Sequence, residues 1–316
     1  MACGLYDRTF ALYCGKIRLP GFSLKFVPMH PPELFFQMIT NPKFDISELS
    51  LSSYVMQKIA RYDYVAIPVF PARRFRHSYI FVNLNSGIKK PSDLSGRRVG
   101  VYNYEITAAV WVRGFLEHEY GVKPSSMRWI TSKEERIEFT KKQDLEINLI
   151  KDVDLTRLLI EGRIDALISP ILSHELLQSG AVRRLFEDYK RVETEYFLRT
   201  NIYPIMHTIV VKEDLLKRHK GLSHMILDIF RSAKKWWYDY LGDPEWQTNQ
   251  LYFTWPMDVI EENKTMLGQD PFPYDIKRNR NVIETLVQYQ YEQGLIDKIP
   301  KIEELFDLET IDYVEN

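Results

Sequence analysis

Blocks of apolar residues alternate with polar stretches along the first 90 residues, at the spacings of strands and helices in turn. Short apolar runs bounded by turn residues predict strands, and apolar residues at helical spacing between them predict helices. The resulting β-α-β-α-β order favours a mostly parallel sheet. The strands are expected at residues 24–27, 44–46, 65–70 and 79–83, and the helices at 32–39 and from Ser47 or Ser50, as the N-cap, to Arg61.

A second series of elements begins near Pro91. Thr107 is the expected N-cap of a helix that runs to about Tyr120, and Gly121 the glycine that ends it. We expect an α/β fold of two lobes, with crossings near 87–91 and 203–207. Lobe I would hold residues 1–90 and 207–316, and lobe II residues 91–206. Further elements are strands at 98–102, 164–168 and 205–211, a helix at 155–160, and a mainly helical, aromatic-rich segment from 213 onward.

The stretch 66–78, AIPVFPARRFRHS, predicts a binding loop. An apolar strand ends there around Pro68 and Pro71, which do not suit a hydrogen-bonded ladder, so we expect the strand to open at this point. In open α/β sheets ligands bind at the carboxyl ends of strands, so cations here indicate an anionic ligand. The alternative is that they are solvated charges or pair with acidic residues. The cationic or titratable side chains are Arg73, Arg74, Arg76 and His77.

Composition and charge narrow the class of protein. The chain has 316 residues, 45% of them hydrophobic and 27% charged, as globular proteins do. Its 42 basic and 43 acidic residues argue against nucleic acid as the main partner. No apolar run reaches the roughly 20 residues of a membrane span, so we expect no membrane partner. Asp7 and Arg8 interrupt the N-terminal apolar stretch, which argues against a signal peptide and favours the cytoplasm. Cys3 and Cys14 are expected to be free thiols.

Sequence motifs for metals and nucleotides are missing. There is no His-x-His, no H-E-x-x-H and no clustered set of Cys and His at ligand spacing. Gly96 and Gly100 do not form a G-x-G-x-x-G loop. We therefore predict chemistry that uses no metal and no cofactor.

Several strings carry a resemblance to a known family. DLSGRRVGV followed by a helix, and later IDALISP, resemble the second lobe of type 2 periplasmic-binding-protein folds. Six sharper strings together resemble the 4,5-dihydroxyphthalate decarboxylase family over nearly the whole chain. The sequence departs from the family at Asp275, where a glycine is expected, and in the charged stretch 134–151. The six strings are YDRT at 6–9, FDISELSLSSY at 44–54, AIPVFPARRFRHS at 66–78, TAAVWVRGFLEHEYGV at 107–122, YPIMHTIVV at 203–211 and GQDPFPYDIKRNR at 268–280.

This resemblance implies a two-lobed, type 2 periplasmic-binding-protein-like fold with a ligand cleft between the lobes. It implies that carboxylates of the substrate meet Arg8, Arg74 and Arg76, with further contacts from Ser50, Tyr104 and Thr107. His77 or His207 would donate a proton, and Asp7 or Glu48 would lie near a phenol. Each residue also has a structural interpretation. Asp7 with Arg8 could be a surface pair, Ser50 and Thr107 could be helix caps, and His207 could be a core histidine.

The activity implied is decarboxylation of a hydroxylated aromatic acid without a cofactor. In a compound such as 4,5-dihydroxyphthalate, protonation of the ring carbon would precede loss of CO2 and leave a product such as protocatechuate. One alternative is a solute-binding protein for an aromatic carboxylate. Another is a lyase similar to the menaquinone-pathway enzymes that share this fold. The expected partner is a small aromatic carboxylate, and a homo-oligomer is left open.

Overall fold

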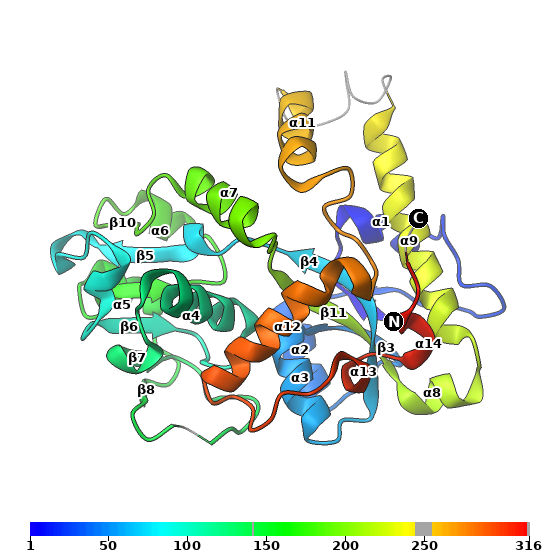
Figure 1. Ribbon diagram of the computed structural model, residues 1–316, viewed down its shortest axis with the longest axis horizontal. Helices are drawn as coiled ribbons and strands as arrows, with labels where there is room; N and C mark the ends of the chain where they lie inside the picture. The colour runs from blue at the N-terminus through cyan, green and yellow to red at the C-terminus, as the bar shows by residue number, and fades with distance from the viewer. Residues whose placement is uncertain (141, 244–254, 315–316) are drawn as a thin grey trace.

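Two β-sheets, each with helices packed around it, lie side by side in the computed structural model, which describes residues 1–140, 142–243 and 255–314 (Figure 1). The first sheet has the strand order β2-β1-β3-β11-β4, and the second β10-β5-β9-β6-β7-β8. The first contains β1 (Ala2–Cys3), β2 (Val27–Pro28), β3 (Ile46–Ser50), β4 (Tyr64–Arg73) and β11 (Ile205–Lys212). The second contains β5 (Ile80–Asn83), β6 (Arg98–Val101), β7 (Arg128–Thr131), β8 (Glu146–Leu149), β9 (Ala166–Ile168) and β10 (Val182–Arg184).

Helices of the first lobe come from both ends of the chain. They are α1 (Asp7–Tyr13), α2 (Pro31–Thr40), α3 (Leu51–Ile59), α8 (Glu213–Arg218), α9 (Leu222–Gly242), α11 (Pro256–Leu267), α12 (Ile276–Glu292), α13 (Ile302–Leu305) and α14 (Leu308–Ile311). The second lobe has α4 (Thr107–Tyr120), α5 (Leu155–Ile160), α6 (His174–Gln178) and α7 (Tyr189–Thr200). Short 3-10 turns lie at His77–Tyr79, Leu84–Ser86, Pro91–Leu94 and Pro124–Ser126. In the part of the chain that is described, no helix has the length and apolar character that crossing a membrane requires.

The sheet of the first lobe is mixed rather than mostly parallel. β1, β2 and β3 run parallel, but β11 lies between β3 and β4 and is antiparallel to both. The expected opening of β4 at its prolines is also corrected. The strand continues to Arg73, and its register against β11 shifts between His207 and Ile209, opposite the Pro68–Pro71 region. The prolines are therefore accommodated by an irregularity in the ladder, as prolines in sheets are at bulges.

The first crossing between the lobes lies earlier than we expected. β5 pairs with β9 and β10 of the second sheet, so the chain has already left the first sheet before Ile80. The crossing is the arginine loop itself, residues 74–79, instead of residues 87–91. The alternation of strands and helices could not reveal this because it does not tell which sheet a strand joins. The second crossing, between α7 and β11, lies close to the expected position.

Helix α12 packs against both lobes at once. Gln290 on α12 donates a hydrogen bond to the Ser52 carbonyl of α3 (3.0 Å). Gln293, directly after α12, donates to the Val110 carbonyl of α4 (3.0 Å) and accepts one from Arg113 Nε (2.8 Å). Figure 1 shows α12 crossing in front of the junction of the two lobes. These buried contacts fix the relative position of α3 and α4, and the lobes with them.

Candidate active site

A glutamate and a histidine meet where β3 and β11 pair. His207 lies opposite Ser50 and Ile209 opposite Glu48, so Glu48 and His207 are diagonal neighbours in the antiparallel ladder. Side chains at such positions share a face and lie within reach of each other. His207 Nδ1 is 2.6 Å from Glu48 Oε1, and Glu48 is fully buried. The pairing of two strands thus forms a carboxylate–imidazole pair.

Three further groups hold the Glu48 carboxylate. Oε2 accepts the Gly4 backbone N–H (2.7 Å) and faces the Cys3 thiol (3.4 Å), while Oε1 accepts the Tyr6 hydroxyl (2.7 Å). Burial alone would raise the pKa of Glu48, but the hydrogen bond and the charge of His207, with Tyr6 and Gly4, bring the pKa below its usual value. Burial and the charge of Glu48 raise the pKa of Tyr6, so its hydroxyl stays protonated and donates.

This arrangement fixes which His207 nitrogen can exchange a proton. An ionised carboxylate only accepts hydrogen bonds, so Nδ1 carries the hydrogen that faces Glu48. Nε2 is then the nitrogen free to take up or deliver a proton at a substrate. Phe35 of α2 packs its ring against the imidazole edge-on, with centroids 4.7 Å apart, and fixes its orientation. His207 therefore has the position of an acid–base group, the role we expected for it or for His77.

Arg8 lies next to the Glu48–His207 pair and places a positive charge there. Its guanidinium stacks between the rings of Tyr6 (4.7 Å) and Phe272 (4.0 Å), and its Nε donates to the Pro71 carbonyl (2.7 Å). Nη1 pairs with Asp7 (2.7 Å), whose side chain is exposed. Asp7 thus forms the surface pair with Arg8, and Glu48 is the carboxylate beside His207.

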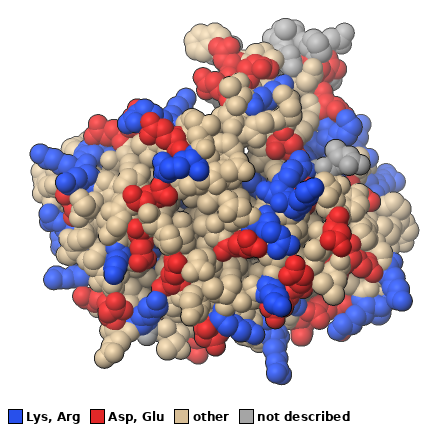
Figure 2. Space-filling view, in the orientation of Figure 1, with Lys and Arg blue, Asp and Glu red and all other residues tan. Residues whose placement is uncertain are grey.

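A cavity of about 1200 Å³ lies beside Arg8, between α9 and α11 and next to the segment 267–272. Of the expected site residues, only Asp7 and Arg8 line it. On the face shown in Figure 2, Lys and Arg side chains gather between α9 and the segment that follows α11. The charged residues that line the cavity are Arg8, Arg231, Lys234, Lys235, Lys264 and Arg278, with Asp7, Asp228, Asp239 and Asp270.

The arginine loop divides its side chains between different environments. Arg74 is exposed and donates from Nη1 to the Tyr79 hydroxyl (2.6 Å). Arg76 is 7% exposed, and its guanidinium contacts the Met206 sulfur (3.0 and 3.2 Å) and the Pro170 carbonyl (3.2 Å). Burial lowers the pKa of Arg76 to about 10. The two guanidinium groups nevertheless lie over the same ring, that of Tyr79, at 5.6 Å from its centroid for Arg74 and 4.8 Å for Arg76.

His77 lies in the second lobe, away from His207. It is 1% exposed and stacks on Phe115 (centroids 4.0 Å apart), with Phe186 and Tyr196 at its other sides. Neither ring nitrogen has a hydrogen-bond partner among the residues that the structure describes. Burial, with the charge of Arg199, lowers the pKa of His77 to about 3. The chain turns into the second lobe at this point, which directs the imidazole into an aromatic core; these surroundings do not support the expected role as proton donor.

Replacing His77 by Leu is expected to flatten the pH dependence of stability and leave kcat within about 2-fold. Below about pH 6.5 the unfolded chain binds a proton at His77 that the folded state does not bind. The free energy of unfolding therefore decreases as the pH is lowered from about 6.5 to 3. This linkage amounts to about 2 kcal/mol between pH 8 and pH 5. Urea unfolding of both proteins at the two pH values measures it. An unchanged pH dependence, or a 100-fold loss of kcat, would contradict this placement.

The side chains of Ser50 and Thr107 join the two lobes. Their hydroxyls are 2.8 Å apart, and the Ser52 backbone N–H donates to Thr107 Oγ1 (2.9 Å). Ser50 is the N-cap residue of α3, as expected, but its side chain makes no capping hydrogen bond there; the N-cap of α4 is Ile106 instead of the expected Thr107. Ser50 is also the residue paired with His207, so this contact brings the start of α4 next to the Glu48–His207 pair.

Tyr104 lies in the second lobe behind α4 rather than at this junction. The guanidinium of Arg113 stacks on its ring (3.6 Å), and Phe139 packs on it with centroids 5.8 Å apart. Tyr104 is fully buried, and burial raises the pKa of its hydroxyl. Its side chain is therefore part of the core of the second lobe, which does not support the expected contact with substrate.

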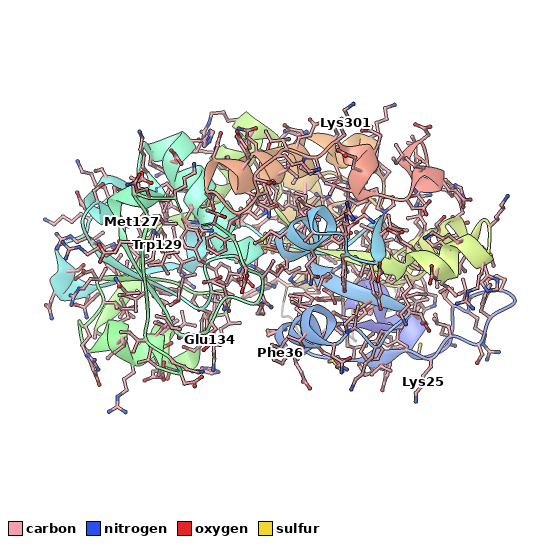
Figure 3. All side chains as sticks on the ribbon, turned by 90° about the horizontal axis from the view of Figure 1, so that it is seen from below. Lys25, Phe36, Met127, Trp129, Glu134 and Lys301 are labelled. Carbon is pink, nitrogen blue, oxygen red and sulfur yellow. The ribbon has the colours of Figure 1, made fainter. Side chains whose placement is uncertain are left out.

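Sequence reasoning missed Tyr6 at the site and Glu135 in the second lobe. Tyr6 could have been suspected, since it directly precedes Asp7 and Arg8 at the end of the first strand. Glu135 belongs to the atypical charged stretch; its carboxylate accepts the backbone N–H groups of Tyr104 (2.8 Å) and Glu105 (3.1 Å). Burial and the charge of Glu105 raise the pKa of Glu135 to about 7. Figure 3 shows the neighbouring Glu134 at the edge of the second lobe that faces Phe36 of the first.

Two curated proteins are similar to the chain in sequence. It is 34% identical over 320 residues to a 4,5-dihydroxyphthalate decarboxylase of Comamonas testosteroni, covering 97% of this chain and 95% of that protein. It is 37% identical over 178 residues to a 4,5-dihydroxyphthalate decarboxylase of Pseudomonas putida, covering 54% of this chain and 69% of that protein. No family model matches the chain.

Solved structures with the same fold are more distant in sequence. The periplasmic aliphatic sulphonate binding protein SsuA of Escherichia coli has a TM-score of 0.56 at 15% identity, with 97% of this chain and 96% of that chain covered. The desulfurization enzyme DSZB has a TM-score of 0.54 at 15% identity, with 97% and 95% covered. Likeness at this level concerns the fold alone. It confirms the expected two-lobed, type 2 periplasmic-binding-protein-like architecture.

Proposed function

The chain belongs to the 4,5-dihydroxyphthalate decarboxylase family, and on this premise we propose that it removes one carboxyl group as CO2 from 4,5-dihydroxyphthalate or a closely related hydroxylated aromatic acid. The relative from Comamonas testosteroni, similar over almost the full length of both proteins, supports the assignment. The observation that carries the site is the buried Glu48 carboxylate bonded to His207 at 2.6 Å. The proposed product is a protocatechuate-like monocarboxylate.

The chemistry requires a proton donor over the aromatic ring. Direct loss of CO2 would leave an unstable aryl anion, so the carboxyl-bearing carbon is protonated first. A ring hydroxyl supplies the electrons by giving its proton to water, which leaves a dienone. The C–C bond then breaks as CO2 leaves, and the phenolate that forms as aromaticity returns takes a proton back from water. Because the dienone formed by ring protonation accepts the electron pair of the breaking C–C bond, this route needs no external electron sink. The proposal therefore includes neither a cofactor nor a metal.

We assign the proton transfer to Nε2 of His207. Protonated His207 delivers its proton to the ring carbon, and the neighbouring Glu48 carboxylate stabilises the imidazolium before the transfer. Tyr6 donates to Glu48 and keeps that carboxylate aligned with Nδ1 (2.7 Å). Arg8 contributes a positive charge next to Tyr6, which suits an anionic substrate.

The location and the partners complete the proposal. The expected partner is the small aromatic acid itself rather than nucleic acid or a membrane, because the charge balance is near neutral. We further propose a cytoplasmic location for the reaction. A homo-oligomer stays open.

Purified protein is expected to release one CO2 per 4,5-dihydroxyphthalate and to form the monocarboxylic product. A panel of hydroxylated benzoates and phthalates, followed by chromatography, would identify the preferred ring. Turnover is expected to persist after exhaustive chelation and dialysis. Tight binding of these acids without CO2 release would instead favour a solute-binding protein. Turnover lost with chelator and restored by a divalent metal would overturn the cofactor-free part of the proposal.

A further inference from the structure

Arg73, the last residue of β4, is a buried cation that forms no ion pair with any residue that the structure describes, although the charges of Asp270 and Asp275 act on it. Its exposed fraction is 8%, and Nη1 donates a long hydrogen bond to the Tyr203 carbonyl (3.4 Å). Its Nε and Nη2 have no acceptor among residues 1–140, 142–243 and 255–314. Burial lowers the pKa of Arg73 to about 10, so the guanidinium still carries its charge at neutral pH. A buried charge without a partner is costly unless an anion binds there.

Other buried and half-buried cations among the described residues use more of their donors, which sets Arg73 apart. Lys234 pairs with Asp270 (2.7 Å), and Arg136 pairs with the buried Glu105 (2.7 Å). Arg113 has no carboxylate, but Gln293 and the Tyr104 carbonyl accept from two of its nitrogens. Arg73 is left with two of its three nitrogens unused. The two unused nitrogens, Nε and Nη2, form the fork that fits a carboxylate.

A line of contacts connects Arg73 with the acid–base pair. Its guanidinium lies 5.9 Å from the Tyr203 ring, and the Tyr203 ring lies 6.1 Å from that of Phe272. Phe272 in turn stacks under Arg8, which contacts the Tyr6 ring beside Glu48. Burial raises the pKa of Tyr203, and the charges of Arg73, Arg8 and Arg74 oppose that rise, as expected where guanidinium groups surround one phenol. In the sheet, Arg73 directly follows Ala72, the residue paired with His207.

The reaction itself determines which carboxylate such a cation should bind. The carboxylate that leaves as CO2 gives up its charge on the way to the transition state. A buried cation bound to this leaving carboxylate would stabilise the ground state more than the transition state and slow the reaction. The second carboxylate of a phthalate keeps its charge throughout. A cation on that group can orient the ring without opposing the chemistry.

We propose that Arg73 binds the carboxylate that the substrate retains, and that it thereby makes the site selective for aromatic dicarboxylates over monocarboxylates. This inference rests on the proposed function, because it assigns the second carboxylate of that same substrate. It also explains why a charge lies at the end of β4, inside a core, without an ion pair among the described residues. We do not assign this role to Arg76, because its guanidinium already contacts Met206 and Pro170.

Binding of phthalate and benzoate tests this assignment without interference from turnover, because neither compound carries the ring hydroxyl that the reaction needs. Calorimetry on the full chain is expected to show phthalate binding at least about 10-fold more tightly than benzoate. In R73Q we expect phthalate affinity to fall about 10- to 100-fold and benzoate affinity to change less than about 3-fold. R73K should recover part of the preference, since it restores the charge without the fork.

Arg184 provides a matched control. It is a half-buried arginine of the second lobe that stacks on Tyr189 (4.8 Å), and R184Q should leave both affinities within about 2-fold. Equal losses for both ligands in R73Q, or no loss, would overturn the inference. If R73Q fails to fold, the wild-type protein and R73K provide the test. The inference is refuted if the wild-type protein does not prefer phthalate to benzoate, or if R73K keeps the full preference. Turnover of 4,5-dihydroxyphthalate is measured in parallel. If the protein turns over 4,5-dihydroxyphthalate but R73Q binds phthalate as tightly as the wild type, only this inference is refuted. If the preference for phthalate depends on Arg73 but no turnover is found, only the proposed function is refuted.

Discussion

Replacing His207 by Gln is expected to lower kcat for decarboxylation by about 10²- to 10⁴-fold, with a much smaller change in KM. The imidazole is held by Glu48 at 2.6 Å and by the edge of Phe35, so it is already oriented for proton transfer. Gln keeps a polar group of similar size but cannot carry a proton between atoms. Steady-state kinetics of CO2 release measure the effect, and urea unfolding shows whether the variant is folded.

Two neighbouring variants separate proton transfer from positioning. Glu48→Gln removes the charge that stabilises the imidazolium and should also reduce kcat strongly. Tyr6→Phe removes one hydrogen bond to Glu48 (2.7 Å), so we expect a fall in kcat of only about 3- to 30-fold, with KM nearly unchanged. A His207→Gln protein with normal stability and near-normal kcat would refute the assignment. If Tyr6→Phe raised KM alone, Tyr6 would be a binding residue rather than a positioning residue.

Gly114→Ala is expected to destabilise the protein by about 3 kcal/mol. Gly114 lies on α4 where α12 crosses it, and an added Cβ would lie only 1.9 Å from the ring of Tyr289. Tyr289 is buried and also packs against Trp111, so its ring has little room to move. The methyl group would push α12 away from α4 and weaken the buried contacts that join the lobes. Urea unfolding measures the loss.

Gly242→Ala is the matched control for this change. Gly242 is also helical, at the end of α9, and its added Cβ would meet nothing within 4 Å. Ala in a helix is more favourable than Gly by roughly 0.5–1 kcal/mol, so this variant should be neutral or slightly more stable. A Gly114→Ala protein as stable as the control would show that α12 can shift without cost. It would contradict the close packing of the two helices.

Local patterns predicted the elements of this fold well where neighbouring residues decide them. The helix at Thr107–Tyr120 was placed with the bounds that α4 has, and Gly121 adopts the left-handed conformation expected of it (φ 68°). The strand at 205–211 corresponds to β11. Periodicity and glycine placement are properties of a few adjacent residues, so a sequence alone carries them.

Contacts between segments that are distant in the sequence could not be predicted from such local patterns. Glu48 and His207 are separated by 159 positions, and only the antiparallel pairing of β11 with β3 brings them together. The sequence nominated both residues but could not show that they form a pair. The surroundings of His77 could not be predicted because the order of strands does not reveal that the chain changes sheets between Arg73 and Ile80. Its position next to three arginines suggested a ligand, whereas the fold directs it among Phe115, Phe186 and Tyr196.

The central position of β11 in the first sheet constrains the order in which the chain can fold as it leaves the ribosome. β3 and β4 are complete by residue 73, but they do not touch each other in the sheet, because β11 lies between them. That strand emerges only after every strand of the second lobe has been synthesised. The second lobe can therefore fold first. Until β11 is synthesised, the edges of β3 and β4 stay unpaired and exposed to chaperones or to other chains. A chain that stops before Ile205 holds Glu48 without His207, and a folded second lobe without a partner.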